Sequence, residues 1–252
     1  MSDERPLILV TNDDGVRAEG VRALADGLAS VGEVVTVAPD REMSGAGHSV
    51  TLRHPLRVTK IDDRRYAVDG TPTDCVLLGS LSVLPRKPDL LVSGINRGAN
   101  LGDDVTYSGT VAAACEGTLL GIPSFSISVV DTVHTRFDVA ASFAAKLAKH
   151  ILGRELPADT LLNVNVPNLP ASEIKGVDIT RQGKHVYRDQ VIEKKDPRGQ
   201  TYYWIAGTIK SNPVDGTDLG AVSQNRISIT PLHLNLTSDE FLDELRGWNI
   251  NI

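Results

Sequence analysis

Two neighbouring carboxylates, Asp13 and Asp14, follow directly on a short apolar run that ends at Thr11. Adjacent carboxylates repel each other, and a bound hard cation with oxygen ligands is the least costly way to keep both ionised. The tetrapeptide Asn-Asp-Asp-Gly on its own is more typical of a turn, because all four residue types are turn formers. Its position after a buried strand favours the metal-ligand interpretation.

Neutral oxygen donors follow the next two apolar runs. Ser44 lies in a glycine-containing loop after the second run, and Asn96 lies in a long loop after the third. Hydroxyl and amide oxygens suit a magnesium or manganese site in which water completes an octahedron. Taken singly, each residue is more often a hydrogen-bonding loop residue. Together they predict one divalent cation, Mg²⁺ or Mn²⁺, which could polarise a phosphoryl oxygen and activate an attacking water.

A helix expected to begin at Gly109 offers a site for an anion. A helix start presents unpaired N–H groups and the positive end of the helix dipole. Ser108, Gly109 and Thr110 therefore form a candidate phosphate cradle, with Asn100 reaching from the same long loop. Without the neighbouring acids, an ordinary capped helix would be the preferred interpretation. His48, close to Ser44, could act as an acid or base near neutral pH, although a solvent-facing loop histidine is the commoner situation.

The elements that must position these residues are strands alternating with helices. Continuous apolar runs predict strands buried on both faces, and helical periodicity predicts the segments between them. We expect strands at 6–11, 33–38, 89–93, 124–129 and 161–166, and helices at 21–32, 73–84, 109–120, 137–152 and 239–247. This alternation predicts an α/β fold with a mostly parallel, doubly wound sheet. Ligands of such sheets bind outside the carboxyl ends of the strands, so Asp13, Ser44 and Asn96 should converge there.

The sequence changes character beyond about Pro167. Short alternating segments such as 200–208 and 226–232 are typical of β-hairpins. We therefore divide the chain into a metal- and phosphate-binding core, residues 1–167, and a β-rich extension with a short final helix, residues 168–252. The extension either packs on the core or reaches another subunit. A simple continuation of the main sheet is an equally open alternative.

The overall composition excludes several classes of protein. A formal net charge of −6 argues against a nucleic acid polymer as partner, since such binding needs clustered Lys and Arg. The sequence has no apolar run of the roughly 20 residues that cross a bilayer, and its first residues do not resemble a signal peptide. Cys75 and Cys115 have no zinc-ligand spacing and are expected to be buried thiols. We therefore expect a cytoplasmic protein without membrane contact.

Several segments of the first half of the chain resemble the survival protein E (SurE) family. They are LVTNDDG at 9–15, APDREMSGAGHSVTL at 38–52, GTPTDCV at 70–76 and SGINRGANLGDDVTYSGTVAAACEG at 93–117, with SITPL at 228–232 as a closing motif. The resemblance implies a Rossmann-like core, a C-terminal β extension used in homodimer or homotetramer assembly, and hydrolysis of 5′- and 3′-nucleotides, in some members also of short polyphosphate. It implies metal ligands at Asp13, Asp14, Ser44 and Asn96, and phosphate contacts at Asn100, Ser108 and Thr110. The tail beyond Pro167 matches only loosely.

The function expected from residues and resemblance together is hydrolysis of nucleoside monophosphates by a divalent-metal-dependent phosphatase, with Asp13 and Asp14 at the catalytic centre. Two alternatives stay open at this point. In the first, Asp13 is a nucleophile that forms an aspartyl phosphate. In the second, the same pocket belongs to a nucleotide sensor without catalytic activity, although two acids beside a phosphate argue against it unless a cation lies between them.

Overall fold

The computed structural model describes residues 5–130, 134–211, 213–248 and 250. Within this part of the chain, nine strands form one sheet in the order β3-β4-β2-β1-β5-β6-β7-β11-β8. Their bounds are β1 Leu7–Thr11, β2 Glu33–Pro39, β3 Val58–Lys60, β4 Arg65–Val68, β5 Leu90–Arg97, β6 Ser124–Val130, β7 Thr160–Pro167, β8 Val177–Ile179 and β11 Ile227–His233. The six strands from β4 to β7 in this order run parallel to one another. The expected mostly parallel α/β fold is confirmed.

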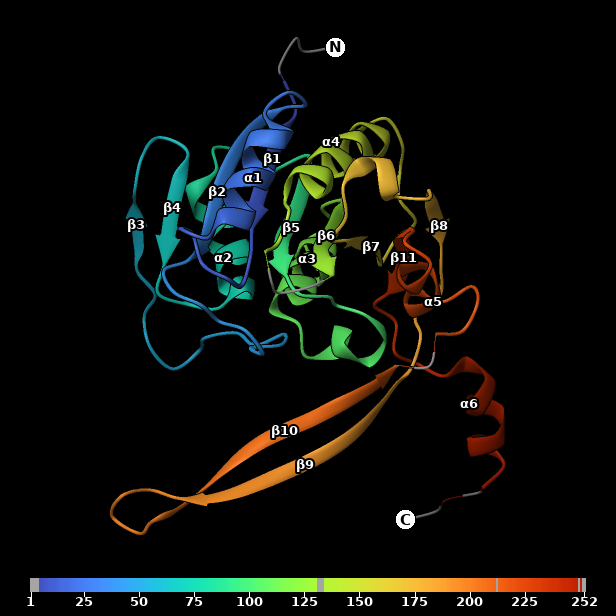
Figure 1. Ribbon diagram of the computed structural model, residues 1–252. Helices are drawn as coiled ribbons and strands as arrows, with labels where there is room; N and C mark the ends of the chain where they lie inside the picture. Colours follow the sequence, from blue (N-terminus) through green and yellow to red (C-terminus); the bar gives the residue numbers. More distant parts are fainter. Residues whose placement is uncertain (1–4, 131–133, 212, 249, 251–252) are drawn as a thin grey trace.

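Helices cover both faces of the sheet (Figure 1). On one face, α1 (Glu19–Leu28) and α4 (Asp138–Leu152) pack in a core that includes Ile8 and Val10. On the other, α2 (Pro72–Leu78) and α3 (Gly109–Leu119) pack in a core that includes Leu9. Successive residues of a strand point to opposite faces, so the fully buried run of β1 supplies both cores.

The remaining helical segments are short. A π-helical turn (Gly79–Val83) continues α2, and 3₁₀ turns occupy Gly102–Thr106 and Ala171–Glu173. Helix α5 (Asp218–Ser223) precedes β11, and α6 (Asp239–Arg246) confirms the helix expected near the C-terminus. None of the helices in the described ranges is long and apolar enough to cross a membrane.

Strand β5 differs from its expected bounds. We expected the strand to end at Ser93 and Asn96 to lie in a loop, but pairing with β6 continues to Arg97. The register shifts between Gly94 and Asn96, so the strand passes through a bulge rather than ending. Asn96 therefore lies on the sheet, opposite Ser128 of β6.

The C-terminal third contains two kinds of β structure. Strands β9 (His185–Lys195) and β10 (Thr201–Ser211) form a separate antiparallel hairpin, as expected for 200–208. This hairpin reaches away from the sheet (Figure 1). The hairpin expected at 226–232 is wrong: β11 pairs antiparallel with β7 inside the main sheet, with Ile229 opposite Val164. The division of the chain at residue 167 stays a prediction.

Candidate active site

The carboxylate of Asp13 is held by the first turn of helix α3. Asp13 stands two residues after the end of β1 and is 4% exposed. The hydroxyl of Thr110 donates a hydrogen bond to Oδ1 of Asp13, and the Thr110 N–H donates to Oδ2 at 3.2 Å. Both carboxylate oxygens thus have a fixed direction, and each keeps a further lone pair for another partner.

The start of α3 comes this close because residue 109 is a glycine. A Cβ at Gly109 would lie 2.9 Å from Cβ of Asp13, closer than real side chains come. Ser108 is the N-cap: its hydroxyl oxygen accepts a hydrogen bond from the N–H of Val111 at 3.1 Å. The expected helix start is confirmed, and it is packed against the first aspartate.

The loop after β2 is tied to the same aspartate through the backbone. The N–H of Met43 donates to the carbonyl oxygen of Asp13 at 2.8 Å. The next residue, Ser44, is exposed, and its hydroxyl donates to the carboxylate of Glu42 at 3.0 Å. Glu42 and Ser44 line one hollow together with Asp14. Two segments that are far apart in the sequence therefore meet, as expected from the strand ends.

The end of β5 supplies the third side of the cluster. The N–H of Arg97 donates to Oδ2 of Asp14 at 3.3 Å. The side-chain amide of the preceding residue, Asn96, donates to the carbonyl oxygen of Gly98 at 2.8 Å. This bond fixes the NH₂ group and leaves the amide oxygen of Asn96 as the free acceptor of that group. The bulge of β5 thus brings an uncharged oxygen donor to the strand end next to Asp14.

The two aspartates are electrostatically unfavourable as they stand. Burial raises the pKa of Asp13, against the hydrogen bonds from Thr110. Burial, and then the charge of Asp13, raises the pKa of Asp14 to about 6. Glu42 adds further negative charge to both. A divalent cation would relieve this repulsion, and the donors present are all oxygens, which Mg²⁺ and Mn²⁺ prefer.

The residues at this site fit a cation only as a combination of carboxylates and neutral oxygen ligands. Within the described ranges, no group of three His, Cys, Asp or Glu side chains is arranged to hold a metal ion. A cation at this site would therefore combine the two aspartates with water and with neutral donors, for which Ser44 and Asn96 are the predicted residues. That composition agrees with the habit of Mg²⁺ to keep several waters and few carboxylates.

Two expected phosphate contacts have other partners in this structure. Thr110 gives both of its donors to Asp13. Asn100 is buried, its side-chain NH₂ donates to the hydroxyl of Ser128 at 2.7 Å, and its N–H donates to Asn165 at 2.9 Å. These bonds anchor Asn100 to β6 and β7. The phosphate-binding roles of Asn100, Ser108, Gly109 and Thr110 stay predictions.

Two acidic residues were missed at the level of sequence, and one of them, Glu42, lies beside the site. Glu42 stands two positions before Ser44, so its nearness to that hydroxyl could have been noticed. Glu116 is buried on α3, and its carboxylate lies 2.9 Å from Nε2 of His48. His48 is exposed, as the commoner interpretation held, but it is paired rather than free. The pair connects the loop that carries Ser44 to α3.

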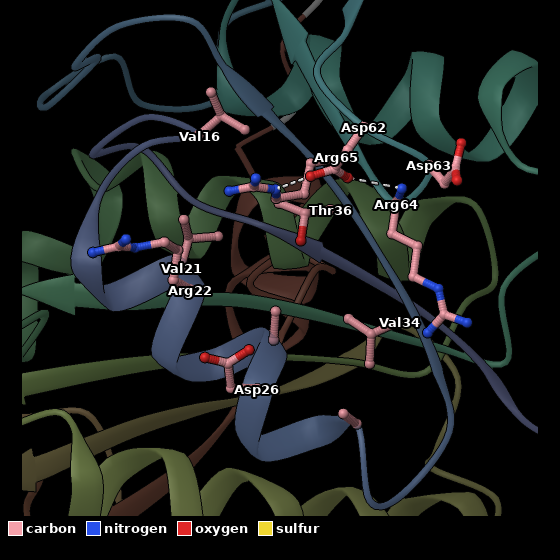
Figure 2. A pocket seen from close by; sticks show the side chains of 12 residues that line it. Val16, Val21, Arg22, Asp26, Val34, Thr36, Asp62, Asp63, Arg64 and Arg65 are labelled. Carbon is pink, nitrogen blue, oxygen red and sulfur yellow. Dashed lines mark hydrogen bonds and ion pairs between the residues drawn. The ribbon is translucent and has the colours of Figure 1, made fainter.

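The hollow beside Asp14 has a volume of about 410 Å³. A second hollow, of about 490 Å³, lies between α1 and the turn that joins β3 to β4 (Figure 2). Its walls carry Asp62, which is paired with Arg65 at 2.6 Å and accepts a hydrogen bond from the N–H of Arg64. The second hollow contains none of the expected site residues, so the candidate active site is the hollow at Asp14.

The chain is similar to known proteins over nearly its whole length. Residues 8–189 match the family described as survival protein SurE. A protein named 5′-nucleotidase SurE from Geobacter sulfurreducens is 55% identical over 246 residues, which covers 97% of this chain and 94% of that one. A protein of the same name from Geotalea daltonii is also 55% identical over 246 residues, 96% of this chain and 99% of that one. The crystal structure of a SurE protein from Aquifex aeolicus superposes with a TM-score of 0.88 at 46% identity, covering 97% of this chain and 100% of that one. The chain belongs to the SurE family.

Proposed function

We propose that the protein is a 5′-nucleotidase, a phosphoric monoester hydrolase that converts nucleoside 5′-monophosphates to nucleoside and phosphate. The observation that carries the proposal is a pair of mutually repelling carboxylates, the buried Asp13 and the partly buried Asp14, with Asp13 packed against the start of α3. This arrangement suits a site where a cation and a phosphate are bound together. The names of the relatives support the choice of nucleotides as substrates.

The residues that would hold the cation are Asp13, Asp14, Ser44 and Asn96, one Mg²⁺ or Mn²⁺ per subunit. Their oxygens and the raised pKa values of both aspartates support this assignment. When bound, such a cation supplies Lewis-acid polarisation of a phosphoryl oxygen and a lowered pKa for an attacking water.

The protein's own groups would then position and stabilise the phosphate. Thr110 holds the carboxylate of Asp13 in one orientation through two hydrogen bonds. Ser108 retains its hydroxyl proton, since its oxygen acts as acceptor in the N-cap bond. That proton and the dipole of α3 would stabilise negative charge on the phosphoryl oxygens. The side-chain NH₂ of Asn100 donates one hydrogen bond to Ser128, and its second hydrogen would donate to the phosphate from the side of the sheet.

Direct attack by water is the step we favour over an aspartyl phosphate at Asp13. Both oxygens of Asp13 accept hydrogen bonds from Thr110, which lowers their capacity to act as a nucleophile. The carboxylate is also buried, with Gly109 packed against it. Isotope exchange into the carboxylate during turnover would support the covalent route instead. Hydrolysis of 3′-nucleotides and of short polyphosphate belongs to the proposal as a wider substrate range.

We further propose that the β9–β10 hairpin joins subunits into a homodimer or homotetramer, within an extension that begins near residue 168. Trp204 and Ile205 of β10 are 60% and 89% exposed, and Val191 of β9 is 66% exposed. Ile205 lies opposite Val191 and Trp204 lies opposite Ile192, so both faces of the hairpin carry exposed apolar side chains. Exposed apolar surface of this kind supports an interaction surface. The cysteines, Cys75 and Cys115, are free thiols, which agrees with the reducing cytoplasm as the proposed location.

The proposal is tested by incubating purified protein with a panel of nucleoside 5′- and 3′-monophosphates in Mg²⁺, Mn²⁺ or EDTA and measuring released phosphate. We expect release with a divalent cation and its loss in EDTA. The Asp13→Asn variant should lose most of its turnover, because the amide supplies neither the charge nor both acceptor oxygens. Full metal-dependent turnover by Asp13→Asn would end the assignment. Nucleotide binding in calorimetry without phosphate release under any metal would indicate a sensor.

A further inference from the structure

One charged residue in the hollow at Asp14 has no part in the chemistry described above. Arg97 lines this hollow together with Phe137, and its guanidinium carbon lies 5.9 Å from the centre of the Phe137 ring. That distance is within the range of a cation–π contact. The backbone N–H of Arg97 bonds to Asp14, but its side chain contacts neither aspartate in any hydrogen bond found in the described structure.

The phenylalanine ring beneath the guanidinium is held in place. Phe137 is only 6% exposed. The first turn of α1 packs against its edge, since a Cβ at Gly20 would lie 3.1 Å from Cε1 of the ring. Arg97 thus rests on a fixed support that a flexible surface arginine lacks.

The guanidinium of Arg97 has two described neighbours, while its side chain remains 50% exposed. Its Cζ lies over the ring of Phe137, and the carboxylate of Glu19 lies 3.9 Å from Nη2. A guanidinium is planar, and a second planar group can stack on its open face. The exposed part of the Arg97 guanidinium is therefore available to a ligand in the hollow.

The charges around the hollow indicate which planar group is suitable. Three carboxylates line it, on Asp14, Glu19 and Glu42, and Arg97 is the one cation among its described lining residues. A second phosphate group placed here would meet the repulsion of Glu19 and Glu42. A neutral aromatic ring would not. The base of a nucleoside monophosphate is such a ring, and a cation at the two aspartates would take only the phosphate.

We infer that Arg97, supported by Phe137, is the residue on which the nucleobase of the substrate stacks. The inference rests on the proposed function, because it takes the phosphate to lie at Asp13 and Asp14. Stacking on a guanidinium accepts every base, since each base has a π-face. Arg97 would therefore favour nucleotides over phosphate esters without an aromatic ring, with little choice among bases.

The test compares two substrates that differ only in the base, adenosine 5′-monophosphate and ribose 5-phosphate, in wild type, Arg97→Ala and Arg97→Lys. We expect the ratio of kcat/KM for the nucleotide to that for the sugar phosphate to fall about tenfold in both variants, mainly through KM. Lysine keeps the charge and loses the plane, so it should not rescue. Phe137→Leu, which keeps the buried apolar volume, should lower the ratio about threefold by removing the support. Arg22→Ala, an exposed arginine of α1 outside this hollow, is the matched control and should leave the ratio unchanged.

Three results would overturn the inference. Equal losses on both substrates would place Arg97 on the phosphate, rescue by lysine would show that only its charge matters, and an unchanged ratio in Arg97→Ala would show no contact with the base. Failure of the proposed function has a different signature, namely no hydrolysis of either substrate by the wild type. In that event calorimetry of the two ligands with wild type and Arg97→Ala still decides whether the base stacks, through the same tenfold ratio in Kd.

Discussion

Thr110 and Asp13 are 97 positions apart in the sequence, and the side chain and the backbone N–H of Thr110 both donate to the carboxylate of Asp13. This contact joins Asp13, in the loop after β1, to the first turn of α3. Orientation of a metal-binding carboxylate by such a neighbour usually matters for activity almost as much as the ligand itself.

Replacement of Thr110 should therefore impair catalysis without removing any proposed ligand. We expect Thr110→Val to lower kcat/KM for a nucleoside monophosphate by about 10- to 100-fold, because the hydroxyl donor to Asp13 is lost. Thr110→Ser keeps the hydroxyl and should retain most of the activity. Steady-state phosphate release measures both. Equal activity of the valine and serine variants would contradict an orienting role for the hydroxyl.

Removal of the charge on Glu42 should weaken cation binding. Glu42 accepts the hydrogen bond of Ser44 and adds negative potential at Asp13 and Asp14. We expect Glu42→Gln to raise the Kd for Mn²⁺ about three- to tenfold, measured by calorimetry. Asp40→Asn, an exposed acid of the same loop, is the control, and a similar loss in that variant would show only a general charge effect.

The stability of the metal-free protein should depend on pH through Asp14. Its pKa is raised from 3.8 to about 6, so the folded state favours the protonated carboxyl. The stabilisation from protonation is fully present below the unfolded pKa of 3.8 and is lost as pH rises through 6. We compare the free energies of unfolding of Asp14→Asn and wild type in EDTA. The variant's value minus the wild-type value should increase by about 1–2 kcal/mol as the pH rises from 3.8 to about 6, after allowance for solvent screening, because only the wild type acquires the unfavourable charge. Urea unfolding at several pH values measures it, and a difference that does not vary with pH would refute the prediction.

The pair of His48 and Glu116 should contribute to stability. Glu116 is buried, and His48 is the partner of its carboxylate at 2.9 Å. We expect His48→Ala to lower the free energy of unfolding by about 1–3 kcal/mol, because the buried carboxylate loses its hydrogen bond. The double variant His48→Ala/Glu116→Gln should recover part of the loss. Chemical unfolding measures these values, and His54→Ala, at an exposed histidine, is the control.

The β9–β10 hairpin should determine the number of subunits in solution. We expect the double variant Trp204→Lys/Ile205→Lys to shift the protein toward a smaller assembly, because it places charge on exposed apolar positions of both faces of the hairpin. Light scattering after size-exclusion chromatography gives the mass. Leu81→Lys, an equally exposed apolar position outside the hairpin, should leave the mass unchanged. A hairpin variant with the mass of the wild type would refute the assignment.

The sequence predicted those parts of the structure that depend on local signals. The apolar run before Asp13 and the Ser-Gly start at Ser108 are both visible in a few consecutive residues, and both are confirmed. The course of β5 past Ser93 was not predictable, because glycine and asparagine are turn formers and only pairing with β6 keeps them in the strand.

Contacts between distant segments could not be predicted from the sequence either. The bond from Thr110 to Asp13 depends on how closely α3 packs on the end of β1, and no local pattern encodes that distance. The antiparallel pairing of β11 with β7 likewise depends on tertiary packing, since a segment of alternating apolar and polar residues can form a hairpin or join a sheet equally well.

The bulge in β5 keeps the main chain of Asn96 and Arg97 in the sheet, which should limit local opening of this segment. Because Asn96 and Arg97 belong to the ladder with β6, their main-chain positions are set by the same pairing that holds Ser93 in the middle of the sheet. Amide protons in this segment should therefore exchange with deuterated solvent on the slow timescale of global opening rather than that of a surface loop. The main chain at Asn96 and Arg97 therefore belongs to the paired part of the sheet, and deletion of Ile95 would turn the side chains of Asn96 and Arg97 each to the other face of the sheet.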